Sequence, residues 1–207
     1  MPRRLLLALA VVLAPCVVLA GLRARVALSR HEPVMAVPVP GVVCGDDGLT
    51  RTSASAARDA GVTVVHAGAC GACSDAADVE ILRRTRETLT MTARSCGMRY
   101  LFLGRAAAAR CMREQVGFSP DCDDCWLDDM ACAITDCMTT CLLSRLKAEP
   151  NNVEGVLNPC LACDETNCGP EFIRCAGANR RRAGIVSDIE RPASQIWTGG
   201  DAPAAAR

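Results

Sequence analysis

This 207-residue chain has few aromatic side chains and few histidines. Aromatic residues make up 3% of the sequence, and it contains only 2 histidines. General acid–base catalysis uses histidine more often than any other side chain. Because His31 lies beside the N-terminal apolar segment, an acid–base role would fall to His66 or to a carboxylate. No nucleophile elbow, phosphate-binding loop or HExxH stretch is present, so we expect no conventional enzyme and no cofactor.

The chain also lacks an excess of charge of either sign. Its 23 basic residues are balanced by 23 acidic residues. A nucleic-acid-binding protein usually carries a net positive patch, so we expect no nucleic-acid partner. The sequence contains no N-x-[ST] sequon, and N-glycosylation is therefore not predicted.

An apolar segment flanked by arginines opens the sequence. Arg3 and Arg4 precede an uncharged run from Leu5 to Leu22, and Val18 and Ala20 occupy the −3 and −1 positions of a cleavage site after Ala20. This layout is typical of a secretory signal peptide. The alternative is an uncleaved signal-anchor, because residues 5–22 reach the lower limit for a membrane-spanning helix.

Both routes deliver the rest of the chain to the secretory pathway. The protein is then extracellular or lumenal, where cysteines pair and an even number is expected. Of 15 cysteines, Cys16 belongs to the apolar segment and fourteen follow it. Those fourteen are predicted to form disulfides: Cys44, Cys70, Cys73, Cys96, Cys111, Cys122, Cys125, Cys132, Cys137, Cys141, Cys160, Cys163, Cys168 and Cys175. Their pairing does not follow from the sequence.

Composition divides the chain into four parts. They are a signal peptide or signal-anchor at 1–31, a linker or stem rich in Pro, Ala and Ser at 32–60, a cysteine-rich helical domain at 61–182, and a disordered tail at 183–207. The domain carries thirteen of the fourteen exported cysteines. Disulfides that restrict the unfolded chain would compensate for its lack of large apolar side chains.

Apolar periodicity within the domain is helical. The predicted fold is mainly α, a disulfide-stapled array of three to four helices with at most one short strand, Val62–Val65. The expected helices run from Asp75 to Cys96, from Arg99 to Val116, from Asp121 to Lys147 and from Gly169 to Arg182.

The helix expected at 121–147 carries five of the cysteines. With regular α-helical geometry, Cys122, Cys125 and Cys132 lie toward one side, whereas Cys137 and Cys141 face elsewhere. This arrangement would staple one helix to two different neighbours.

The sequence Cys70-Gly-Ala-Cys73 follows the predicted strand and precedes a helix. A strand, a CxxC and a helix in this order resemble the redox site of thioredoxin-like proteins, over about 25 residues. The resemblance implies that Cys70 is the nucleophile and Cys73 the resolving thiol. The rest of the chain departs from that family, since it offers no further strands and no cis-proline loop. The other interpretation is that Cys70 and Cys73 each bridge to a distant helix.

Three C-x2-C pairs and His66 form the ligand pattern of a structural zinc domain. Cys70/Cys73 are the first pair, and Cys122/Cys125 and Cys160/Cys163 are the others. Behind an export signal the same spacing is usually a disulfide framework, and no metal site is predicted.

We therefore expect a non-enzymatic, secreted or membrane-anchored cysteine-rich module. It would bind an unidentified protein partner or serve a structural role at the cell surface or in the secretory lumen. A thiol–disulfide oxidoreductase that uses Cys70 and Cys73, and a zinc-stabilised domain, are the alternatives.

Overall fold

The computed structural model describes residues 3–29, 41–154, 156–177, 179 and 183. Residues 184–207 of the tail predicted at 183–207, and the arginines at 180–182 at the end of the fourth predicted helix, lie outside these residues. Ala183, the first residue of that tail, is buried in the main core.

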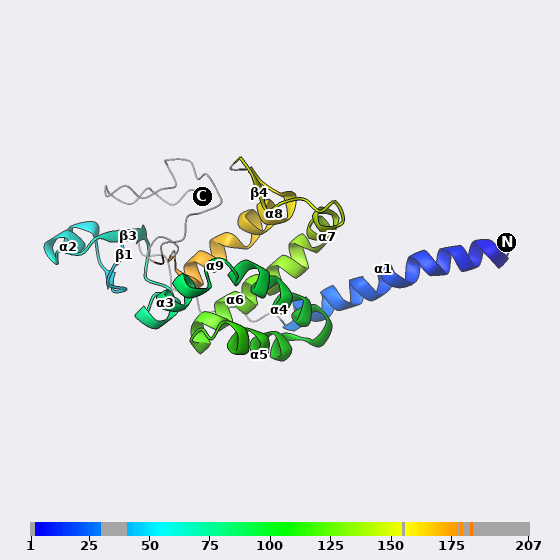
Figure 1. The fold of residues 1–207 in the computed structure, drawn as a ribbon, viewed down its shortest axis with the longest axis horizontal. Helices are drawn as coiled ribbons and strands as arrows, with labels where there is room; N and C mark the ends of the chain where they lie inside the picture. Colours follow the sequence, from blue (N-terminus) through cyan, green and yellow to red (C-terminus); the bar gives the residue numbers. More distant parts are fainter. Residues whose placement is uncertain (1–2, 30–40, 155, 178, 180–182, 184–207) are drawn as a thin grey trace.

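The fold is mainly helical and stapled by disulfides, as predicted (Figure 1). The described residues contain more elements than the sequence indicated. The helices are α1 (Arg3–Ser29), α2 (Ala54–Asp59), α3 (Ala76–Thr85), α4 (Leu89–Leu103), α5 (Arg105–Gln115), α6 (Pro120–Cys132), the π-helix η1 (Ala133–Cys137), α7 (Met138–Leu146), α8 (Pro159–Asn167) and α9 (Gly169–Ala176). The strands are β1 (Val43–Gly45), β2 (Thr50–Arg51), β3 (Val64–Ala67), β4 (Asn152–Val153) and β5 (Val156–Leu157).

Helix boundaries in the first half of the domain differ from those predicted. Asp75 caps α3, because its side chain accepts hydrogen bonds from the backbone N–H of Ala77 and Asp78. The chain breaks after Thr85, however, and α4 then continues through Gly97. The break between α4 and α5 falls at Gly104, where φ is +92°. A side chain disfavours that conformation and glycine does not, so Gly104 rather than Gly97 ends the helix.

Residues 43–67 form a small lobe, although the sequence placed most of them in a linker. Strands β2, β1 and β3 form an antiparallel sheet in that order. Helix α2 is capped by Ser53, whose side chain accepts from the N–H of Ala56 at 3.1 Å. The lobe has its own small core, made of Val43, Ala54, Ala57 and Val64.

The main core lies among α3, α4, α5 and α6. Tyr100 and Met112 are fully buried there, and Leu127 is 2% exposed. Three of the few aromatic residues form a cluster, in which Trp126 stacks on Phe118 with ring centroids 5.8 Å apart and contacts Phe172 edge-on at 4.9 Å. This body extends through α9 and carries all the disulfides except the one in the lobe.

The two halves of α1 have different surroundings. Toward its end, Val26 is 1% exposed and lies in the main core, and Arg23 donates a hydrogen bond to the carbonyl of Thr135. Earlier in the helix Val17 is 69% and Val18 60% exposed, and the helix projects away from the body (Figure 1). Among the described residues, α1 included, no helix is both long and apolar enough to cross a bilayer.

Candidate functional site

The cysteines that follow α1 are all joined in pairs. Among the described cysteines, only the exposed Cys16 is unpaired. Seven disulfides point to an oxidising secretory or extracellular environment. The bridges are Cys44–Cys70, Cys73–Cys122, Cys96–Cys111, Cys125–Cys175, Cys132–Cys168, Cys137–Cys163 and Cys141–Cys160.

Cys70 and Cys73 are not bonded to each other. Cys70 closes the lobe through Cys44, and Cys73 joins the start of α6 through Cys122. A dithiol redox site needs both thiols of its CxxC in one reversible bridge. The oxidoreductase hypothesis requires a bridge between Cys70 and Cys73, and the structure does not have this bridge.

The glycine of this CxxC has a packing role. The backbone of the motif lies against the end of α9, where Ala72 N donates to Cys175 O at 2.7 Å and Cys73 N donates to Ala176 O at 3.1 Å. A Cβ atom at Gly71 would collide with the backbone of Ala176 and Gly177. Close backbone approach thus explains this glycine, which sequence reasoning connected with a redox motif.

The predicted zinc alternative meets the same obstacle. The two sulfurs of each C-x2-C pair go to different bridges, so their thiolates are not available as ligands. His66 is 8% exposed in β3, and its Nδ1 lies 2.8 Å from the carbonyl oxygen of Ala67. An Nδ1–H donor satisfies that carbonyl, which is a structural role for the ring.

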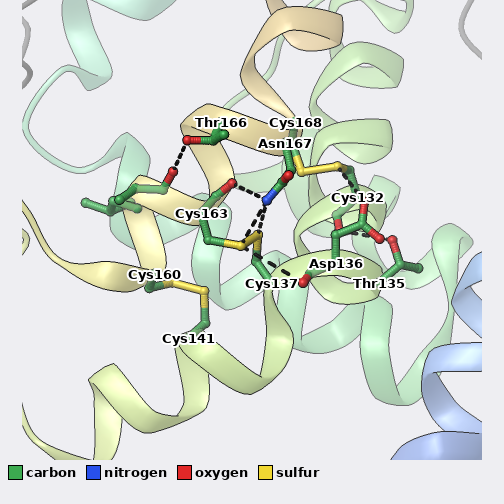
Figure 2. The surroundings of a disulfide bond; sticks show 12 residues. Cys132, Thr135, Asp136, Cys137, Cys141, Cys160, Cys163, Thr166, Asn167 and Cys168 are labelled. Carbon is green, nitrogen blue, oxygen red and sulfur yellow. Dashed lines mark hydrogen bonds between the residues drawn. A yellow bond between two sulfur atoms is a disulfide. The ribbon is translucent and has the colours of Figure 1, made fainter.

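Three disulfides form a ladder between the α6–η1–α7 helix and α8 (Figure 2). Its rungs are Cys132–Cys168, Cys137–Cys163 and Cys141–Cys160, in antiparallel order. Asn167 supports the middle rung by donating to Cys163 O at 2.9 Å. The ladder locks α8, a helix that sequence reasoning missed even though Asn158 and Pro159 form a good helix start.

The π-helix brings the ladder's cysteines into line. Cys132 and Cys137 are five residues apart, and in an α-helix that spacing would turn their side chains about 140° away from each other. A π-helix has i to i+5 hydrogen bonds and a wider turn, so five positions come close to one full turn. Through η1, Cys132 and Cys137 both reach partners at 163–168. The prediction that Cys137 and Cys141 face away from Cys132 was wrong because it assumed a regular α-helix.

A cavity beside the Cys125–Cys175 bridge is too small for a substrate. Its volume is about 10 Å³, which is room for about one water molecule. Carboxylates and sulfurs line it, but the sulfurs belong to two formed disulfides, Cys125–Cys175 and Cys132–Cys168. The lining residues are Cys125, Asp128, Asp129, Cys132, Cys168, Glu171, Phe172 and Cys175.

Buried carboxylates lie near the start of α6. Asp78 accepts hydrogen bonds from Ser119 N at 2.8 Å and from Ser119 Oγ at 2.6 Å. Burial raises the pKa of Asp78 in spite of these bonds. Asp123 is 3% exposed, and neither of its carboxylate oxygens has a hydrogen-bond partner. Burial raises the pKa of Asp123 to about 6, against an opposing effect of Arg113.

Arg105 pairs with carboxylates on α6. It contacts Asp124 at 2.8 Å and Asp128 at 2.5 Å, and Asp128 is largely buried. These ion pairs dock α5 on α6. The acids of the α6 surface are thus used in part for internal packing.

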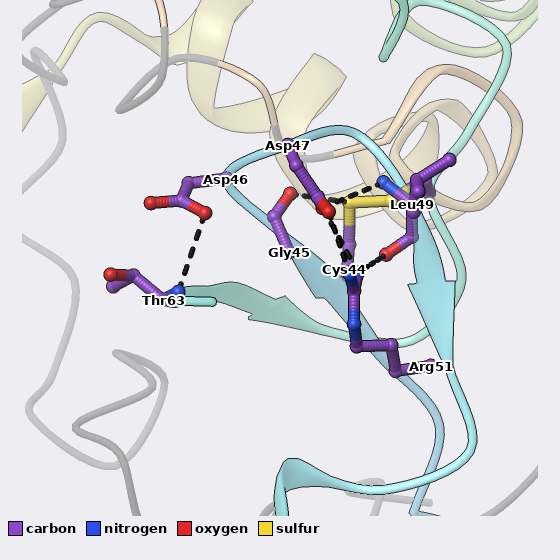
Figure 3. Close-up of polar contacts among 8 residues, drawn as sticks. Cys44, Gly45, Asp46, Asp47, Leu49, Arg51 and Thr63 are labelled. Carbon is purple, nitrogen blue, oxygen red and sulfur yellow. Dashed lines mark hydrogen bonds and ion pairs between the residues drawn. A yellow bond between two sulfur atoms is a disulfide. The ribbon is translucent and has the colours of Figure 1, made fainter. Parts of the chain in front are cut away.

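The lobe has its own exposed ion pair, at the turn between β1 and β2 (Figure 3). Arg51 donates to both carboxylate oxygens of Asp47, at 2.9 and 2.6 Å. This pairing lowers the pKa of Asp47. Asp46 accepts from Thr63 N at 3.3 Å and so ties the turn to the segment before β3. These contacts stabilise a turn, and the carboxylates of Asp46 and Asp47 are both used as hydrogen-bond acceptors in it.

One surface of α4 combines exposed apolar side chains with cations. Met91 is 64%, Met98 44%, Phe102 53% and Leu103 65% exposed. The buried side of the helix carries Leu89, Cys96, Tyr100 and Leu101. We call the large apolar and the cationic residues among the exposed residues of this helix the α4 face; they are Met91, Arg94, Met98, Arg99, Phe102 and Leu103.

Sequence reasoning did not single out the α4 face. Its residues recur at three- and four-residue steps, the pattern of a second apolar stripe on the same helix. That signal was present, but the boundary predicted at Gly97 divided it between two helices.

Comparison with known proteins gives a family without an assigned role. Residues 105–198 match the model of a family described as a family of unknown function, DUF8771. The match starts at the first residue of α5 and contains the whole disulfide ladder, but not the lobe or the α4 face. No curated protein and no solved structure matches the chain.

Proposed function

We propose that this protein is an exported, non-enzymatic module that binds another protein through the α4 face. Its N-terminal apolar segment directs export, and its disulfides hold the helices in the oxidising compartment. The partner that fits is an amphipathic helix with acidic residues beside its apolar stripe.

The α4 face is the observation that carries this proposal. Large apolar side chains gathered on a surface mark interaction sites, and methionines adapt to the shape of a partner. The helix supplies Arg94 and Arg99 to the same face, and its sequence contains no acid. Charge complementarity therefore favours an acidic partner, and the spacing suits packing along a helix.

The reactive groups of the chain favour binding over catalysis. The fourteen paired cysteines offer neither thiolates nor metal ligands. The cavity at the Cys125–Cys175 bridge holds no substrate-sized volume. What the described residues present to solvent is a rigid scaffold with an unusual apolar surface.

Site-specific photo-crosslinking on cells that export the protein tests the proposal. A photoreactive residue at Met98 is expected to give a discrete protein adduct, whereas the same residue at Glu114, exposed on α5, gives none. Charge reversal by Arg99→Glu should reduce the Met98 adduct at least about tenfold, since it removes the charge complementarity. Arg110→Glu, the matched change on the exposed side of α5, should leave it unchanged.

Two outcomes would refute this function. Equal adducts at both positions would mean that the α4 face is not a specific surface. Adducts with lipid alone would mean that the apolar side chains meet a membrane and not a protein.

A further inference from the structure

The boundary between the exposed and the packed half of α1 coincides with the sequence signal for cleavage. Up to Ala20, the residues of α1 whose exposure is described have their apolar side chains mostly in solvent, Val17 and Val18 among them. From Leu22 onward the helix packs on the body, where Leu22 contacts the main core and Val26 is buried in it. Exposure of apolar side chains to water is unfavourable, so this part of the helix favours either another environment or removal.

We propose that a peptidase specific for small residues cuts the exported chain between Ala20 and Gly21, and that residues 21–29 stay in place as the first structural helix of the mature domain. In this step water adds to the carbonyl carbon of Ala20 and the C–N bond to Gly21 breaks. The nitrogen takes up both protons of the water, which leaves a carboxylate on Ala20 and an ammonium group on Gly21. This inference rests on export, as the proposed function does.

Cysteine pairing supports the position of the cut independently. Cys16 is exposed and unpaired, and it lies upstream of Ala20. A cut at this position removes the odd thiol and leaves the fourteen cysteines that are already paired. Export without the cut would carry a free thiol into an oxidising compartment, where it forms intermolecular bridges.

Local helix geometry makes the site accessible. Pro15 lies inside α1 and cannot donate the helical backbone hydrogen bond. At Gly21 a Cβ atom would meet nothing within 4 Å, so the backbone there is open to an approaching enzyme. Glycine also weakens a helix interior. The stretch between Pro15 and Gly21 is therefore the part of α1 that opens most readily.

The retained helix has contacts that a discarded leader would not need. Arg23 donates to the carbonyl of Thr135 in η1, and a π turn leaves helix carbonyls in need of such donors. Arg25 reaches Gly104, at the break between α4 and α5. Together with Val26, these contacts join three separate segments of the body.

The test starts from the full chain, expressed in cells that export it. N-terminal sequencing and intact mass of the exported protein should give Gly21 as the first residue and no free thiol. A start at Met1, or at any residue beyond Ser29, would overturn the inference. Absence of an exported, fully bridged protein would refute the proposed function itself, so the two failures are distinct.

Two pairs of variants separate processing from packing. Ala20→Leu puts a bulky residue at −1 and should retain the leader together with a titratable Cys16 thiol, whereas Val17→Leu, also exposed, should be processed normally.

In the processed protein Val26→Ala should lower the Tm by about 4 °C through lost core packing. Leu28→Ala, on the exposed side of the same helix, should lower it by less than about 1 °C. Equal Tm values for these two variants would show that residues 21–29 do not pack after processing.

Discussion

The lobe of residues 43–67 and the helical body are stabilised in different ways. The lobe has a four-residue core, short strands and one bridge, Cys44–Cys70, that ties β1 to the segment directly after β3. The body combines a continuous core with bridges between segments far apart in sequence, such as Cys125–Cys175 with a separation of 50. Because body bridges such as Cys96–Cys111 and Cys125–Cys175 also join two packed helices, covalent and apolar contributions depend on each other there. In the lobe the single bridge supplies most of the restriction on the unfolded chain.

The largest effect is expected in the body, from an insertion that changes the register of η1. One alanine inserted between Asp136 and Cys137 raises the spacing of the ladder's first two cysteines from five positions to six, which rotates Cys137 and Cys141 away from α8. Two bridges should then fail to form, at a cost of about 6 kcal/mol of unfolding free energy. Non-reducing peptide mapping and urea unfolding would measure both results.

Deletion of Asp136 is the matched control for this insertion. It shortens the spacing of Cys132 and Cys137 to one α-helical turn, at which side chains share a face. All three rungs should persist in a regular α-helix. If the deletion and the insertion both break the ladder, the π-helix does not set its register.

Removal of the lobe's bridge should have a smaller and more local effect. In the double variant Cys44→Ser and Cys70→Ser, the lobe should lose about 3 kcal/mol of local stability, since the bridge closes a loop of moderate length. Hydrogen exchange should show protection lost at Val43 and Val64 and retained at Tyr100 in α4. Simultaneous loss of protection in both regions would mean that lobe and body unfold as one unit.

The smallest effect comes from pH and belongs to the body alone. The pKa of Asp123 is raised from its ordinary value of 3.8 to about 6, so the folded state binds the proton more tightly than the unfolded state. This contribution to stability is complete below about pH 4 and is lost as pH rises through about 6. We expect a loss of about 2 kcal/mol between pH 4 and pH 7.

The variant Asp123→Asn should remove this pH dependence, as followed by urea midpoints between pH 4 and pH 8. Asp121→Asn, an exposed change in the same helical turn, should retain it. An unchanged slope in the Asp123 variant would assign the pH dependence to another group.

The helical class and the even cysteine framework could be predicted from the sequence, because count and periodicity depend only on the residue types. The helix breaks were harder. Gly97 and Gly104 look alike in sequence, and only the local backbone at Gly104 takes the positive φ that ends a helix. The lobe was missed because a three-residue strand such as β1 carries too little periodicity to stand out among prolines and alanines.

The site was less predictable than the fold. Pairing of Cys70 with Cys44 depends on the antiparallel sheet that brings the two segments together, and no local pattern encodes it. The ladder depends on a single π turn, which no residue type specifies. The α4 face depends on where α4 begins and ends.

The contact between the CxxC segment and the end of α9 also sets the order in which the protein can mature. Gly71 and Ala72 pack on residues 175–177, and Cys125 has its partner at Cys175. The bridges Cys44–Cys70 and Cys96–Cys111 can close as soon as their own segments are made, whereas the partner of Cys125 is synthesised 50 residues later. Cys125 must therefore stay reduced, or exchange wrong bridges, until the end of the domain reaches the oxidising compartment. The yield of the native pairing then depends on how readily wrong bridges exchange there.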